Sequence, residues 1–171
     1  MVAAGDVVHA ADVVDIQTHL ADRSVTMSTT AITPLVSASV TDTLIASVSH
    51  DFIDEWAYEI AWSWAAQFNG GTSPFVAYTK IKRTNAAGTE IRGIAGTTCV
   101  STNVMQVEGS CIVKCTAGNT TQTIALVGGY SASGAPTSLD VEASSVRRTK
   151  IEVKRIGTAA EYTDALEVPT A

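Results

Sequence analysis

Residues 57–68 alternate between apolar side chains at every even position and Ala, Glu, Ser or Gln at the odd positions. The even set comprises Tyr58, Ile60, Trp62, Trp64, Ala66 and Phe68. A period of two places successive side chains on opposite faces of a strand. This segment therefore predicts a long β-strand whose even face is buried in a core.

The composition extends the β prediction to most of the chain. The sequence holds 19 Val, 12 Ile and 23 Thr but only 6 Leu, and β-branched residues favour strands. Turn signals such as Asn69-Gly70, Glu108-Gly109-Ser110 and Gly118-Asn119 separate the candidate strands. The other strands are expected at 35–40, 43–49, 75–83, 90–95, 98–108, 111–116, 121–127, 138–146 and 150–156. We therefore expect an all-β fold over residues 35–157, an antiparallel β-sandwich of jelly-roll form.

The segment before this domain has a different period. Within residues 9–23, Val13, Ile16 and Leu20 follow the spacing of one helical face, and Arg23 is expected in the last turn. Such a short amphipathic α-helix is marginal alone, so its apolar stripe must bind a partner. We assign residues 1–24 to an N-terminal anchor or oligomerisation segment, 25–34 to a linker, and 158–171 to a tail or a partner-binding arm.

Charge and hydropathy exclude several classes of function. The net charge of -6 argues against nucleic-acid binding, and no apolar run is long enough for a membrane span. The N-terminal residues lack the pattern of a secretory signal, which favours a cytoplasmic origin. The three cysteines, Cys99, Cys111 and Cys115, are therefore expected to be free thiols. No sequence motif of a cofactor, metal or nucleophilic site is present, so we expect no enzyme and no cofactor.

Two further hypotheses concern functional sites around residues 50–56. His50 beside Asp51 suggests an oriented imidazole of a hydrolase, although solvated acids at a strand end explain residues 51–55 better than catalysis or calcium. Trp56 lies just before the long strand and is the best candidate for an exposed aromatic that stacks on a glycan. The other two tryptophans belong to the predicted core face.

Charge is distributed unevenly along the chain. Residues 1–72 hold nine acids and one base, whereas residues 73–171 hold eight acids and ten bases. Five of those bases cluster around one predicted strand: Arg147, Arg148, Lys150, Lys154 and Arg155. A solvated strand face explains this cluster. The alternative is a partner-binding seam with the acidic N-terminal part of another subunit or with another acidic surface.

The opening segment Ala4-Gly5-Asp6-Val7-Val8-His9-Ala10-Ala11-Asp12 resembles the N-terminus of tailed-phage virion proteins, which often have Thr at the place of His9. The stretches 68–75 and 148–157 are similar to small virion β-domains of phages that infect actinobacteria. The resemblance implies a non-enzymatic structural protein of the capsid or tail, often a trimer.

From this resemblance we expect a capsid decoration or head-fibre protein, assembled into the virion in the host cytoplasm. Its partner would be the major capsid protein or another virion protein, and its β-domain would form a homo-oligomer. The alternative is a tail-associated, receptor-binding adhesin that holds host glycans.

Overall fold

The structure is a computed structural model that describes residues 22–28, 32–35, 42–70, 75–99, 104–130 and 138–168. Strands form nearly all of its regular structure, as the composition predicts. They are β1 (Arg23–Ser28), β2 (Ile32–Leu35), β3 (Thr43–Phe52), β4 (Trp56–Asn69), β5 (Phe75–Arg83), β6 (Glu90–Cys99), β7 (Val104–Cys115), β8 (Thr120–Tyr130), β9 (Ser138–Glu142), β10 (Thr149–Thr158) and β11 (Leu166–Glu167). A 3-10 turn, η1 (Ala159–Glu161), follows β10.

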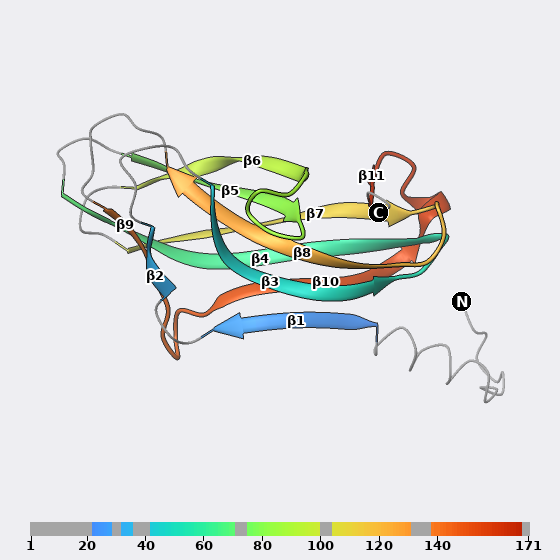
Figure 1. The fold of residues 1–171 in the computed structure, drawn as a ribbon, viewed down its shortest axis with the longest axis horizontal. Helices are drawn as coiled ribbons and strands as arrows, with labels where there is room; N and C mark the ends of the chain where they lie inside the picture. The colour runs from blue at the N-terminus through green and yellow to red at the C-terminus, as the bar shows by residue number, and fades with distance from the viewer. Residues whose placement is uncertain are drawn as a thin grey trace, which may run out of the picture.

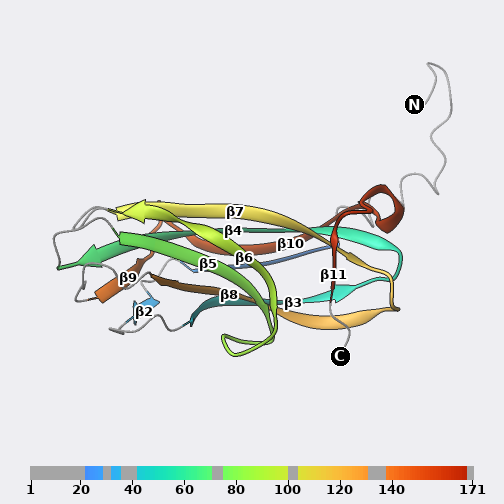
Figure 2. The ribbon, with the colours of Figure 1, turned by 90° about the horizontal axis from the view of Figure 1, so that it is seen from above.

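The strands form two sheets packed face to face (Figures 1 and 2). Sheet A has the order β1-β10-β4-β7-β11, with β9 paired to β4 and to β2, and sheet B has the order β3-β8-β5-β6. Eight strands make up the sandwich: β1, β3, β4, β5, β6, β7, β8 and β10. When these are renumbered 1 to 8 along the chain, sheet A has the order 1-8-3-6 and sheet B has the order 2-7-4-5. This alternation of strands from both halves of the chain is the order of a jelly roll, so the sandwich expected from the sequence is present.

The even face of β4 forms the centre of the core, as its period of two predicts. Tyr58, Trp64 and Phe68 are fully buried there. Trp64 also joins the two sheets, because its indole Nε1 donates a hydrogen bond of 2.9 Å to Thr79 Oγ1 on β5. Aromatic side chains on one long strand therefore fix how sheet A lies on sheet B.

The turn expected at residues 108–110 does not exist, because β7 continues through it and pairs with β4 without a register shift. Gly109 lies opposite Trp62 in this pairing. A Cβ atom on Gly109 would come 2.7 Å from Trp62 Cζ2, so the glycine makes room for the indole ring. The glycine marks a close approach of side chain and backbone in the core, not a change of chain direction.

The expected domain boundaries at the N-terminus are wrong in part. Arg23 begins β1 and does not end a helix, and β1 and β2 occupy most of the segment 25–34 that was expected to be a linker. Residues 23–28 pair with β10 in an antiparallel register, and the Asp22 carbonyl accepts a hydrogen bond from the Arg155 N–H, so residues 22–28 belong to the β-domain. The rest of the expected helix, with Val13, Ile16 and Leu20, lies outside the described residues.

The C-terminal segment, expected as a tail or as an arm on a neighbour, packs on its own chain. β11 pairs in parallel with the end of β7, and the Val168 N–H donates a hydrogen bond of 2.7 Å to the Lys114 carbonyl. Val168 is buried in the core. Val168 thus finds its apolar partners within the domain, whereas Leu166 is 41% exposed.

Candidate partner-binding surfaces

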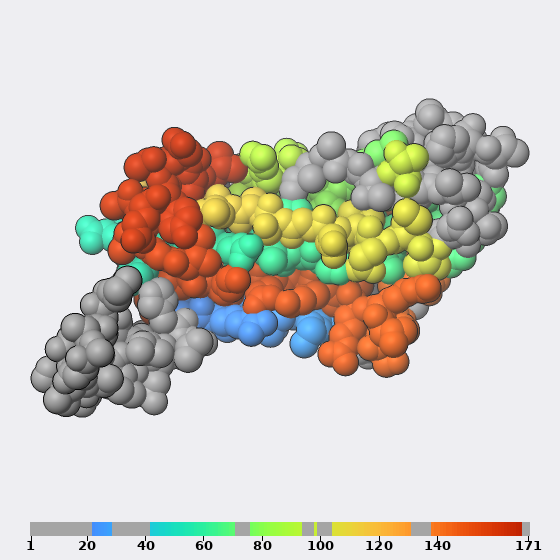
Figure 3. Space-filling model, turned by 180° about the vertical axis from the view of Figure 1, so that it is seen from behind, coloured from blue at the N-terminus to red at the C-terminus, as the bar shows by residue number. Residues whose placement is uncertain are grey.

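The outer face of sheet A is built from the four strands β1, β10, β4 and β7 (Figure 3). Its centre is made of small side chains, since Ala61 on β4 lies opposite Ser110 on β7. On the β1 side, Val25 lies opposite Glu152 and Met27 opposite Lys150. This face is therefore charged over β10, small over β4, and apolar at the β1 edge.

The charges over β10 are paired within the chain. Glu152 contacts both Arg23 and Lys150, and Lys154 Nζ lies 2.8 Å from Glu59 Oε2. Burial opposes ionisation of Glu152, but Lys150 and Arg23 outweigh it and hold the pKa of that carboxyl below its usual value. Lys150 and Lys154, which the seam alternative would pair with another subunit, thus already have acidic neighbours in their own chain.

Arg155 is not a solvated residue of the basic cluster. It is only 8% exposed, and its Nε lies 3.2 Å from Asp22 Oδ2 on the residue just before β1. Its guanidinium carbon lies 4.2 Å from the centre of the Trp56 ring. Trp56 itself is half-buried as the first residue of β4. One face of the aromatic ring expected to stack on a glycan is therefore covered by Arg155.

Sequence reasoning missed a buried polar cluster around His50. His50 Nδ1 lies 2.9 Å from Ser24 Oγ, and His50 Nε2 lies 3.3 Å from Asp22 Oδ1. Three strands, β1, β3 and β10, contribute to this cluster together with Asp22. The pairing register alone brings Asp22 to Arg155, so no local motif could have indicated it.

The hypothetical His50–Asp51 pair is not brought together as a site. His50 points into the domain against the rings of Phe52 and Tyr58, whose centroids lie 4.9 and 5.1 Å away. The exposed Asp51 accepts a hydrogen bond of 2.6 Å from Thr121 Oγ1. Alternation along β3 sends the two side chains to opposite faces.

The buried His50 makes stability depend on pH. Burial lowers its pKa, and Arg155 lowers it further, while Asp22 and Asp51 act in the opposite direction. Below about pH 6.5, His50 is protonated in the unfolded chain more readily than in the folded chain. We expect the free energy of unfolding to fall between about pH 6.5 and 5.

Urea unfolding of the full chain and of His50→Gln, measured at both ends of this range, checks the prediction. The variant should have a smaller pH slope, whereas an equal slope in the two proteins would assign the effect to other groups. Asp42 is not expected to contribute in this range. Burial opposes its ionisation, but Lys82, Lys80 and Tyr78 outweigh burial and hold its pKa below the usual value.

Arg147 and Arg148 remain available to a partner. They lie in the exposed loop between β9 and β10, next to Val146, which is 89% exposed. The loop leads into Thr149, which lies opposite Ser28, so the two arginines lie at the C-terminal end of β1. Figure 3 shows this loop in orange at one end of the outer face.

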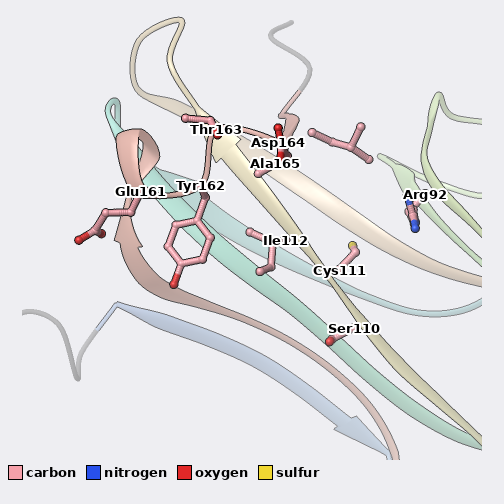
Figure 4. A pocket seen from close by; sticks show the side chains of 10 residues that line it. Arg92, Ser110, Cys111, Ile112, Glu161, Tyr162, Thr163, Asp164 and Ala165 are labelled. Carbon is pink, nitrogen blue, oxygen red and sulfur yellow. The ribbon is translucent and has the colours of Figure 1, made fainter.

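A surface cavity of about 540 Å³ lies at the opposite edge of sheet A, between β6, β7 and the segment before β11 (Figure 4). Arg92, Cys111, Ile112 and Tyr162 are among the side chains that line it. Burial raises the pKa of Cys111 to about 11, with Arg92 and Glu59 acting in opposite directions. The thiol is therefore protonated at neutral pH and is a poor nucleophile.

Two further findings concern only the described part of the chain. It contains no group of three His, Cys, Asp or Glu side chains that could hold a metal ion. It also has no helix of the length and hydropathy needed to cross a membrane.

Comparisons with known proteins give fold similarities only. No family model matches the chain, and no curated protein matches its sequence. A solved structure of the T13 IBDV viral particle is 12% identical, with a TM-score of 0.49, and the alignment covers 80% of this chain and 36% of that one. T=1 particles derived from infectious bursal virus give 12% identity, a TM-score of 0.48, and coverage of 81% and 37%.

A structure of xylanase 10B from Clostridium thermocellum, with CBM22-1 and GH10 modules, is 9% identical to this chain and has a TM-score of 0.29. The alignment covers 80% of this chain and 26% of that one. The chain thus spans little more than a third of the length of the viral proteins to which it is similar. Similarity at these scores carries no conclusion about function.

Proposed function

We propose that this chain is a non-enzymatic structural protein of a tailed-phage particle, of the capsid decoration or head-fibre type. The jelly-roll domain with an N-terminal segment that resembles those of phage virion proteins carries this proposal. Jelly rolls serve capsid and lectin domains alike, so the fold is compatible with both functions. The resemblance of the N-terminal segment supports the capsid function.

The junction between residues 1–21 and the β-domain is firmly attached to the domain through Asp22. The Asp22 carbonyl accepts a hydrogen bond of 3.2 Å from the Arg155 N–H, and the Asp22 carboxylate lies between His50 and Arg155. The point at which residues 1–21 join the domain is therefore held by contacts with two other strands. In the proposed mechanism, Val13, Ile16 and Leu20 bury their side chains against the particle.

The proposed partner is the major capsid protein or another virion protein, and assembly takes place in the host cytoplasm. Homo-oligomerisation of the β-domain would raise avidity, because several N-terminal segments would bind the repeated capsid surface at once. The covered ring of Trp56 gives no support to the adhesin alternative.

Rebinding to particles tests the proposal. Particles assembled without this chain are mixed with the purified protein and sedimented, and the bound amount is measured against concentration. Saturable binding with a fixed number of copies per particle is the expected result. Binding that fails to saturate, or no binding, would contradict a specific structural role.

A further inference from the structure

β1 presents an open edge of sheet A. The Asp22 carbonyl accepts from the Arg155 N–H, so Asp22 and the other even residues of this strand direct their backbone groups toward β10. The backbone N–H and C=O groups of Arg23, Val25 and Met27 consequently point away from β10. The described part of the chain places no strand on that side. The same residues are exposed, with Val25 at 41% and Met27 at 52%.

Most of the other strand edges are irregular. β3 and β6 have register shifts against their neighbours, and β2 has a register shift and Pro34. β7 pairs with β4 without a shift, and β11 covers it at Val113 and Lys114. β1 pairs with β10 over all of its residues without a shift. Regular edge strands with exposed apolar side chains are templates for strand addition unless something covers them.

We propose that two copies of this chain pair through β1, in an antiparallel register about a two-fold axis at Val25. Sheet A would then continue from one subunit into the other. A two-fold contact requires a self-complementary surface, and β1 satisfies this condition. This inference rests on the proposed function, which includes self-association of the β-domain, and assigns that self-association to β1.

The register centred on Val25 places no like charges opposite each other. Val25 lies beside the partner's Val25, and Arg23 lies beside the partner's Met27. The Arg23 guanidinium stays with Glu152 of its own subunit, while its aliphatic stem packs on the methionine. A register centred on Arg23 would instead oppose two arginines, which is unfavourable.

Charges at the two ends of β1 favour the same arrangement. The loop with Arg147 and Arg148 lies at the C-terminal end, and Asp22 precedes the N-terminal end. Antiparallel pairing brings the basic loop of each subunit to the end of the partner's β1 that Asp22 precedes, so association should weaken as salt rises.

The decisive experiment measures the mass of the full chain in solution by sedimentation equilibrium. We expect a species of twice the 17.8 kDa chain mass. Val25→Lys places two ammonium groups opposite each other at the axis, while within one subunit the new lysine faces Glu152. It should raise the dissociation constant of the dimer by about tenfold or more. Unfolding by urea establishes that the variant is folded.

Ile112→Lys is the matched control. Ile112 is 39% exposed on the opposite edge of sheet A and lies opposite Glu59, as Val25 lies opposite Glu152. This variant should keep the wild-type mass. Val25→Pro removes the outward N–H of β1 and keeps the N–H groups that face β10, so it gives a second test if Val25→Lys does not fold.

A monomeric or trimeric wild-type protein would overturn the β1 contact, and so would unchanged association of folded Val25→Lys and Val25→Pro variants. Loss of association in Ile112→Lys would move the interface to the other edge. The mass measurement uses no particles, so a negative result would contradict the β1 contact and not the proposed binding to virions. A negative result in the particle-rebinding experiment would contradict virion binding and not the dimer.

Discussion

Deletion of residues 1–21 should abolish incorporation into particles while the β-domain remains folded. The expected loss follows from removal of Val13, Ile16 and Leu20, which carry the proposed contact with the particle. Asp22, Arg23 and Ser24 stay in place in this variant, and so do their contacts with β10 and His50. Immunoblots of purified particles measure incorporation, and circular dichroism measures the fold.

A second deletion, of residues 1–24, separates anchoring from stability. It removes Asp22, which lies between His50 and Arg155, and leaves the buried Arg155 without its acidic partner. Loss of one member of a buried ion pair typically costs about 3–5 kcal/mol. The longer deletion should therefore unfold at lower urea concentration than the shorter one. Normal incorporation of the variant that lacks residues 1–21 would contradict the proposal that these residues anchor the protein to the particle.

Trp64→Ala should cause a large loss of stability. The side chain is fully buried between the sheets, and replacement of a buried tryptophan by alanine costs about 3–5 kcal/mol. Trp64→Phe keeps an aromatic ring but leaves Thr79 Oγ1 without its indole donor, so a loss of about 1–3 kcal/mol is expected. Urea unfolding measures both changes.

Val146→Ala supplies the control for this series, because Val146 is almost fully exposed. Its free energy of unfolding should change by no more than about 0.5 kcal/mol. If Trp64→Ala lowered the free energy of unfolding no more than Val146→Ala does, the proposed role of Trp64 in joining the two sheets would be contradicted.

The sequence was informative where one strand carried its own pattern. The even positions of β4 are buried as predicted, because a period of two needs only the local chain and one core to become visible. The turn prediction at Gly109 was wrong because this position requires a glycine for another purpose, which is to make room for the Trp62 ring on the neighbouring strand. A glycine that makes room for a ring looks locally like a glycine that permits a turn.

The candidate site was harder to predict, because its contacts depend on strand register. Arg155 appeared in a basic run with Lys154, yet alternation sends Lys154 to the outer face and Arg155 inward to Asp22. Trp56 looked exposed because it preceded the periodic run, and Arg155 covers it from another strand. Sequence periodicity predicts which residues share a face of one strand. It does not predict which residues of a different strand lie beside them.

Imaging of intact particles tests the virion role most directly. Particles with and without this chain are compared by electron cryomicroscopy, and the difference density is examined for a β-sandwich at repeated positions on the head. The account predicts such density, joined to the capsid surface by a segment that enters the domain at Asp22. Identical particles in the two preparations would contradict it.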